Sequence, residues 1–163
     1  MITIDSISVS KPWRKNSIAS MVVGVPIEIK ENENRVSMTP YAVRTLADDG
    51  HDVLIQESAG LKSGFSNDEY KENGARIVGT FDEIYNESDM IIKVKEPQEA
   101  ELSKIKKSQI IFTYFHFAAS RKLTQSIISS NCVAIAYETV QTENKNLPLL
   151  VPMSEIAGRL SVH

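Results

Sequence analysis

Three side chains that could act together on a small carboxylic acid follow short apolar runs of this sequence. Arg35 comes after "VVGVPIEI", Lys95 ends "DMIIKVK", and His116 ends "IIFTYFH". Arginine presents a planar fork that matches two carboxylate oxygens, and lysine adds a point charge that can also polarise a carbonyl group. A histidine beside them could move a proton to or from an alcohol, an amine or a carbonyl oxygen. Together the three residue types suit the binding and chemistry of a small carboxylate.

His116 and Lys95 also have simpler explanations. His116 lies in an aliphatic and aromatic run, so it could be a core histidine whose imidazole bonds to a backbone carbonyl. Lys95 could pair with Glu96 at an exposed strand end. Only the position of each residue in the fold can decide between these explanations and a functional site.

Arg35 and Ser154 are open to two interpretations as well. Arg35 could be a surface cation paired with Glu31 or Glu33. Ser154, in "PMSEIAG", could simply cap the last helix. Because the N-terminus of a helix attracts phosphate groups, the same serine could instead contact a nucleotide.

Short apolar runs alternate with helix-like segments along the chain. Aliphatic runs that are too brief for a helix predict strands, and they are bounded by glycine, proline and polar residues. We predict strands over 21–29, 52–56, 76–79, 89–97, 109–117 and 132–140. We predict helices over 39–50, 66–74, from 80 onward, 98–107, 118–131 and from 152 onward.

Three predicted helices begin with residues that favour a helix N-terminus. Thr39 is a good N-cap ahead of a proline, and Ser66 or Asn67 opens the next helix. Thr80 with Glu83 forms the pattern of a capping box. These starts separate the helices from the strands that precede them.

The alternation predicts an α/β fold, with a mostly parallel open sheet and helices on both faces. In such sheets ligands bind beyond the carboxyl ends of the strands. Arg35, Lys95 and His116 all fall at that edge, although they follow different strands. We therefore expect the three side chains to converge.

Composition excludes several classes of function. The 163 residues carry a net charge of −3, so nothing indicates nucleic-acid binding, and no apolar run approaches the roughly 20 residues that span a bilayer. One cysteine excludes an intrachain disulfide, and neither HExxH nor paired histidines indicate a metal. GxGxxG, GxxxxGK[ST] and GxSxG are absent as well. We expect no nucleic-acid, membrane or metal partner.

The first twenty residues differ from the rest of the sequence. Residues 1–20 are rich in serine and carry Lys11, Arg14 and Lys15 against a single acid, Asp5. Transit peptides share this bias, but an amphipathic pattern is weak here and no long apolar stretch is present. We expect a disordered N-terminal extension, or a misplaced translation start, rather than a targeting signal.

Six ordered blocks of the sequence resemble one enzyme family. "VGVPIEIKENENRVSMTP", "GHDVLIQESAG", "DMIIKVKEP", "FTYFHFAASRKLT", "AYETVQ" and "LPLLVPMSEIAGR" closely resemble the N-terminal part of bacterial alanine dehydrogenases. That family also includes the NAD-binding subunit of proton-translocating transhydrogenase and the lysine-forming saccharopine dehydrogenases. The resemblance implies a flavodoxin/Rossmann-like substrate domain over 21–152. Residues 153–163 would begin a helix that leads to an NAD-binding domain.

The resemblance implies a role for each candidate residue. Arg35 would hold the substrate carboxylate, Lys95 would contact the substrate, His116 would be the catalytic acid/base, and Ser154 would lie near the cofactor. The implied reaction is the reversible, NAD-dependent oxidative deamination of L-alanine to pyruvate and ammonia. The implied enzyme is cytoplasmic and a homo-hexamer, with L-alanine or pyruvate as its small-molecule substrate.

The sequence departs from the family in its length. Alanine dehydrogenases are about twice as long, so the Gly-rich loop, the acid that binds the cofactor ribose, the catalytic aspartate and a helix that pads the substrate domain have no counterpart here. We expect the 163-residue chain alone to be inactive and catalysis to belong to a longer parent enzyme. The alternatives are a stand-alone domain that binds a small 2-oxo or amino acid, and a relative of the transhydrogenase α-subunit. The histidine at position 116 favours the dehydrogenase, because the transhydrogenase branch has no histidine there.

Overall fold

The computed structural model describes residues 20–161. Within this range six strands form a single sheet in the order β3-β2-β1-β4-β5-β6. Every neighbouring pair in the sheet is parallel. The strands are β1 (Val22–Val25), β2 (Asp52–Gln56), β3 (Ala75–Val78), β4 (Met90–Ile92), β5 (Ile110–Thr113) and β6 (Val133–Ala136). The predicted disorder of the N-terminal extension concerns residues that, apart from Ser20, lie outside the described range.

The helices follow the strands in alternation. They are α1 (Pro40–Asp48), α2 (Asn67–Glu72), α3 (Phe81–Glu87), α4 (Glu99–Leu102), α5 (Arg121–Ser130) and α6 (Val151–Leu160). Short 3₁₀ turns occur at Leu61–Ser63, Phe117–Ala119 and Tyr137–Thr139. The predicted α/β fold with a parallel open sheet is confirmed. No helix of residues 20–161 has the length and apolar character needed to cross a membrane.

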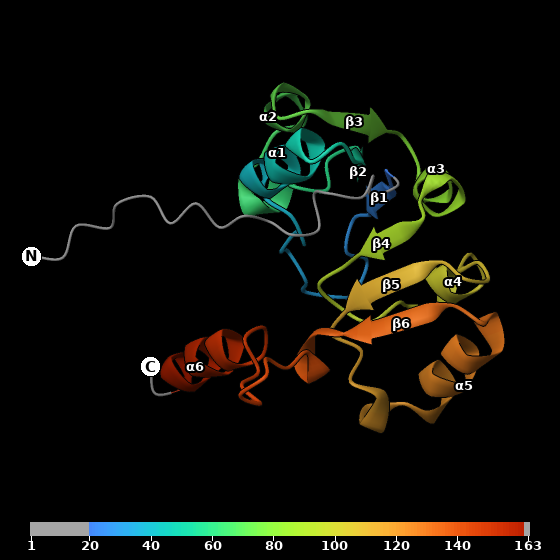
Figure 1. The fold of residues 1–163 in the computed structure, drawn as a ribbon, viewed down its shortest axis with the longest axis vertical. Coiled ribbons are helices and arrows are strands. Elements are labelled where there is room, and N and C mark those ends of the chain that lie inside the picture. The colour runs from blue at the N-terminus through green and yellow to red at the C-terminus, as the bar shows by residue number, and fades with distance from the viewer. Residues whose placement is uncertain (1–19, 162–163) are drawn as a thin grey trace, which may run out of the picture.

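Helices cover both faces of the sheet, as Figure 1 shows, with α1 and α2 on one side and α3, α4 and α5 on the other. The alternation of side chains along a strand divides the core accordingly. Val53 and Ile55 of β2 belong to the cluster beneath α1 and α2, whereas Leu54 between them belongs to the cluster beneath α3 and α5. All three are at most 1% exposed, so β2 is buried on both faces.

The helix starts follow the predicted capping pattern. The Thr39 hydroxyl accepts the amide N–H of Ala42. Ser66, rather than Asn67, caps α2, and its capping box is complete. Thr80 and Glu83 form the predicted capping box of α3. Each cap satisfies backbone donors that the first helical turn leaves free.

Several elements are shorter than the sequence pattern predicts. The strand predicted over 89–97 ends at Ile92, and the strand predicted over 109–117 ends at Thr113. Beyond Ile92 some backbone groups still bond to a neighbouring strand, but others bond to buried side chains instead. This change of partner ends the regular ladder. The helix predicted over 98–107 covers only Glu99–Leu102, because Ile105 turns into the core. The last helix begins at Val151, with Pro152 in its first turn.

Candidate functional site

One cavity brings together the four candidate residues of the sequence analysis. It has a volume of about 340 Å³ and is lined by Arg35, Lys95, Tyr114, His116, Leu150, Met153, Ser154 and Ala157. The residues come from the loops after β1, β4 and β5, from α6 and from the residue that precedes α6. The strand order reverses direction between β1 and β4, and such switch points are where open α/β sheets bind ligands. The predicted convergence at one sheet edge is therefore observed.

Arg35 lines the cavity and at the same time pairs with Glu33. The guanidinium donates from Nε to Glu33 Oε1 at 2.8 Å and from Nη2 to Oε2 at 2.6 Å. Glu33 is buried, and this bidentate contact holds the pKa of its carboxyl at about 2. The pairing predicted as a simpler explanation thus exists, with Glu33 as the partner. A guanidinium has five N–H donors, so three of them are not used by Glu33.

Lys95 lies half-buried at the cavity, three residues beyond the end of β4. The proposed pairing with Glu96 is wrong, because Glu96 accepts the ammonium group of Lys30 at 2.5 Å. The backbone of Lys95 is anchored on both sides: its carbonyl accepts the Thr113 hydroxyl at 2.8 Å, and its amide faces Glu28 at 3.4 Å. The chain therefore holds the backbone of Lys95 while its side chain lines the cavity.

His116 is exposed at the cavity, so the explanation as a core histidine is wrong. Its backbone adopts the left-handed conformation, with φ 51° and ψ 43°, which L-residues seldom occupy. The Glu138 carboxylate accepts the amide N–H groups of His116 at 2.8 Å and of Phe115 at 3.2 Å. This contact supports the strained turn, which leaves the imidazole at the mouth of the site.

Tyr114 lines the cavity and connects it to the segment before α6. Its ring stacks beside the His116 imidazole, with centroids 6.1 Å apart and an interplanar angle of 19°. Its hydroxyl donates to the backbone carbonyl of Leu149, just before α6. Burial raises the pKa of the Tyr114 phenol, so the group stays a neutral donor at physiological pH.

Ser154 does not cap the last helix. It lies inside α6, where its amide N–H donates to the carbonyl of Leu150, and its side chain lines the cavity. The explanation as an N-cap is therefore wrong. Ser154 is the only one of the four candidate residues that a helix supplies.

Sequence reasoning missed Glu138 and Tyr114. Tyr114 lies two residues before His116, a spacing that puts both side chains on one side of an extended segment and could have pointed to it. Glu138 is 22 residues from His116, and no local pattern connects the two.

A buried ionic cluster, which sequence reasoning also missed, surrounds Lys93. The Lys93 ammonium is fully buried and contacts Glu28 at 3.2 Å and Glu101 at 2.8 Å. The Tyr85 hydroxyl donates to Glu101 at 3.1 Å. Burial raises the pKa of Glu28, and Lys93 opposes that rise. Four buried polar side chains, from the loop after β1, the residue after β4, α3 and α4, are thus joined in one network.

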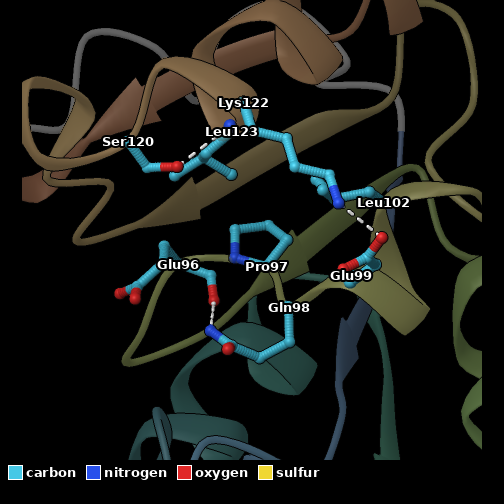
Figure 2. Close-up of a pocket in the computed structure, with 8 residues that line it drawn as sticks. All are labelled: Glu96, Pro97, Gln98, Glu99, Leu102, Ser120, Lys122 and Leu123. Carbon is cyan, nitrogen blue, oxygen red and sulfur yellow. Dashed lines mark hydrogen bonds and ion pairs between the residues drawn. The ribbon is translucent and has the colours of Figure 1, made fainter.

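Other hollows of the described surface lack this combination of groups. The hollow in Figure 2 measures about 240 Å³ and lies between the start of α4 and the start of α5. Polar side chains that line this hollow already have partners within the protein. Lys122 forms an ion pair with Glu99 at 2.5 Å, and the Gln98 side chain donates a hydrogen bond to the backbone carbonyl of Glu96. A further hollow beside β6 is largely apolar. Over residues 20–161 no cluster of histidine, cysteine and acidic side chains could hold a metal ion.

Residues 24–157 match the family described as alanine dehydrogenase/PNT, N-terminal domain. This match covers most of the chain, and the chain belongs to that family. Among curated proteins, the alanine dehydrogenase of Mycolicibacterium smegmatis is 51% identical over 141 residues. The alanine dehydrogenase of Methanococcus maripaludis is 49% identical over 142 residues. These alignments cover 86% and 87% of the chain but only 38% of each relative's length.

Solved structures give the same relationship. A structure of an L-alanine dehydrogenase matches with a TM-score of 0.83 and 48% identity, covering 87% of this chain and 39% of that one. A transhydrogenase from Sinorhizobium meliloti matches with a TM-score of 0.70 and 25% identity, covering 76% of this chain and 35% of that one. The chain therefore spans well under half the length of these relatives.

Proposed function

We propose that this chain is the substrate-binding part of an NAD-dependent alanine dehydrogenase, and that Arg35, Lys95 and His116 are its substrate site. The observation that carries the proposal is the single cavity that these three side chains line at the switch point of the sheet. The parent enzyme would interconvert L-alanine with pyruvate and ammonia. Its identity as a dehydrogenase is supported by relatives named alanine dehydrogenase that are 51% and 49% identical in sequence.

The charges of the cavity fit a small 2-oxo or amino acid. The free N–H groups of Arg35 would hold the carboxylate, with Glu33 fixing the plane of the guanidinium from behind. Lys95 would contact the same ligand and polarise its carbonyl oxygen. His116, at the open side, would exchange a proton with the substrate as water adds and ammonia leaves. A volume of about 340 Å³ lies at the small end of ligand pockets and suits a molecule of this size.

The residues present do not make a dinucleotide site on their own. The sequence contains no GxGxxG, and the cavity supplies one candidate contact to a nicotinamide, the Ser154 hydroxyl. NAD, when bound, would accept a hydride from the substrate carbon, and we assign its binding to sequence outside these 163 residues.

The transhydrogenase branch of the family is the second candidate. The family description and the Sinorhizobium meliloti match both include it. We favour the dehydrogenase for two reasons. The sequence identity to the L-alanine dehydrogenase structure is about twice that to the transhydrogenase structure, and a histidine occupies position 116. The family resemblance also leads us to propose a cytoplasmic homo-hexamer for the parent enzyme.

Pyruvate binding tests the substrate site. Isothermal titration of the purified chain with pyruvate should give saturable binding at neutral pH, and acetone, which lacks the carboxylate, should not bind. Arg35→Met should weaken pyruvate binding at least tenfold, because the carboxylate loses its planar partner. Arg44→Met is the matched control, since Arg44 pairs with Asp48 on the exposed surface of α1. Equal pyruvate affinity in Arg35→Met and wild-type protein would contradict the assignment.

Alanine oxidation tests the division of the enzyme. NADH formation from L-alanine, followed at 340 nm, should be absent with the isolated chain. Activity that disappears in His116→Ala would show that this chain needs no further domain, which would refute our assignment of the NAD site. A reading frame that continues past His163 into a GxGxxG motif would support it and would argue against a stand-alone binding domain.

A further inference from the structure

The backbone of the segment from Ile92 to Lys95 is held by hydrogen bonds to side chains of the loop after β1 and of β5. The Ser37 hydroxyl donates to the carbonyl of Ile92 at 2.8 Å. Glu28 accepts the amide N–H of Val94 at 2.6 Å, and its other oxygen faces the Lys95 amide at 3.4 Å. Three residues past the end of β4, the backbone is thus held by the loop that also carries Arg35.

Thr113 holds the same segment from the opposite side. It is the last residue of β5 and is fully buried, and its hydroxyl donates to the carbonyl of Lys95 at 2.8 Å. The next residue along, Tyr114, lines the cavity, and His116 follows two positions later. Thr113 therefore links the backbone of Lys95 to the strand that presents the histidine.

Glu28 performs a task here that an apolar side chain could not. Burying a carboxylate beside an ammonium is seldom a net gain in stability, and well-packed apolar residues often do as well. An apolar side chain in its place would leave the amide of Val94 without an acceptor inside the protein. Lys93 supplies the opposite charge that lets Glu28 stay in this position.

We propose that Glu28 and Thr113 are positioning residues for Lys95, and that the buried Glu28–Lys93 pair serves to hold the loop after β4 in register with Arg35 and His116. Neither residue lines the cavity. The consequence for ligand binding rests on the proposed substrate site, whereas the effect on the Lys95 backbone does not.

A pair of substitutions at Thr113 isolates its hydroxyl. Thr113→Val keeps the shape and removes the donor to Lys95, and Thr113→Ser keeps the donor and removes a methyl group. We expect Thr113→Val to weaken pyruvate binding about tenfold and Thr113→Ser to bind within about twofold of wild type. Equal losses in both variants would overturn the proposal, because the methyl group rather than the hydroxyl would then matter.

Thr45→Val is the matched control. The Thr45 hydroxyl also donates to a backbone carbonyl, that of Tyr41, but on exposed α1. Its removal should leave pyruvate affinity unchanged. An equal loss in Thr45→Val would show that any such bond matters, and the proposal would fail.

Two readouts in ligand-free protein separate this proposal from the proposed function. The NMR shifts of the Glu96 amide, which shares its peptide group with the Lys95 carbonyl, should move in Thr113→Val and stay in Thr113→Ser. In Glu28→Met, which removes the acceptor of the Val94 amide, hydrogen exchange at Val94 should accelerate at least tenfold more than at Leu54 in β2, which reports global unfolding. If wild-type protein binds no pyruvate, the substrate site fails while these readouts still decide the positioning. The positioning proposal would be overturned if the Glu96 amide shifts did not change in Thr113→Val, or if hydrogen exchange at Val94 accelerated no more than exchange at Leu54.

Discussion

Replacement of Lys93 by methionine should destabilise the chain by about 3–5 kcal/mol at pH 7. The ammonium lies 3.2 Å from Glu28 and 2.8 Å from Glu101, and its side chain is 0% exposed. At an effective dielectric constant of about 20, each contact is worth about 5–6 kcal/mol before desolvation is subtracted. Because methionine fills a similar volume, the loss comes from two carboxylates that are left buried without a counter-charge.

The loss should depend on pH in a defined direction. Burial already raises the pKa of Glu28, and removal of Lys93 takes away the charge that opposes this rise. A folded-state pKa above the unfolded value of 4.5 means that the folded variant binds the proton more tightly. The free energy of unfolding of Lys93→Met therefore falls as pH rises from 4.5. The difference in stability between wild type and variant is largest at pH 7 and shrinks toward pH 5.

Urea denaturation followed by circular dichroism at pH 5, 6 and 7 measures this deficit without changing ionic strength. Lys122→Met is the matched control, because Lys122 forms an ion pair with Glu99 in which both side chains are largely exposed. Exposed pairs contribute about 0–1 kcal/mol, so this variant should change stability little. A loss below about 1 kcal/mol in Lys93→Met, or a deficit that grows toward pH 5, would refute the reasoning.

Three further changes can be tested by the same denaturation assay. Gly24→Ala should lower the free energy of unfolding by about 1–3 kcal/mol, because a β-carbon there would lie 2.2 Å from the Ser88 hydroxyl oxygen. Unchanged stability would show that the surrounding side chains can move to accommodate the methyl group. Gly158→Ala, in exposed α6, should instead raise stability by about 0.5–1 kcal/mol and increase the helical signal, since nothing lies within 4 Å of the added carbon. Glu33→Gln should cost about 1–2 kcal/mol at pH 7, discounted for the exposure of Arg35, and nothing near pH 2. The depressed pKa of Glu33, about 2, makes its contribution complete above pH 4.5 and lost as pH falls toward 2, so a pH-independent difference would contradict the pairing.

Much of the architecture could be predicted from local patterns. The alternation of apolar runs and helix-like segments led to a parallel α/β sheet, and the caps at Thr39, Ser66 and Thr80 marked the helix starts. The rule that ligands bind beyond strand ends predicted that Arg35 and Lys95 lie at one edge of the sheet. These inferences succeed because caps, periodicity and strand length depend on residues close together in sequence.

Element ends and the environment of each side chain were beyond such reasoning. The sequence pattern predicted strands over 89–97 and 109–117, whereas β4 ends at Ile92 and β5 at Thr113. Beyond these ends, backbone amides bond to the side chains of Glu28 and Glu138, which come from distant parts of the chain. An apolar neighbourhood in sequence also suggested a core histidine, whereas the left-handed turn exposes it.

The sequence by itself determined which chemical groups are available: a guanidinium, an ammonium and an imidazole that each follow a separate strand, and a serine hydroxyl near the start of the last helix. The tertiary structure decided that these groups line one cavity, that Glu33 orients the guanidinium of Arg35, and that Glu138 supports His116 from 22 residues away. It also decided that Lys93, two residues from Lys95 and of the same chemical type, is fully buried between two carboxylates. The physical reason is that pairing, burial and strain depend on groups brought together by the packing of strands and helices, which no short stretch of sequence contains.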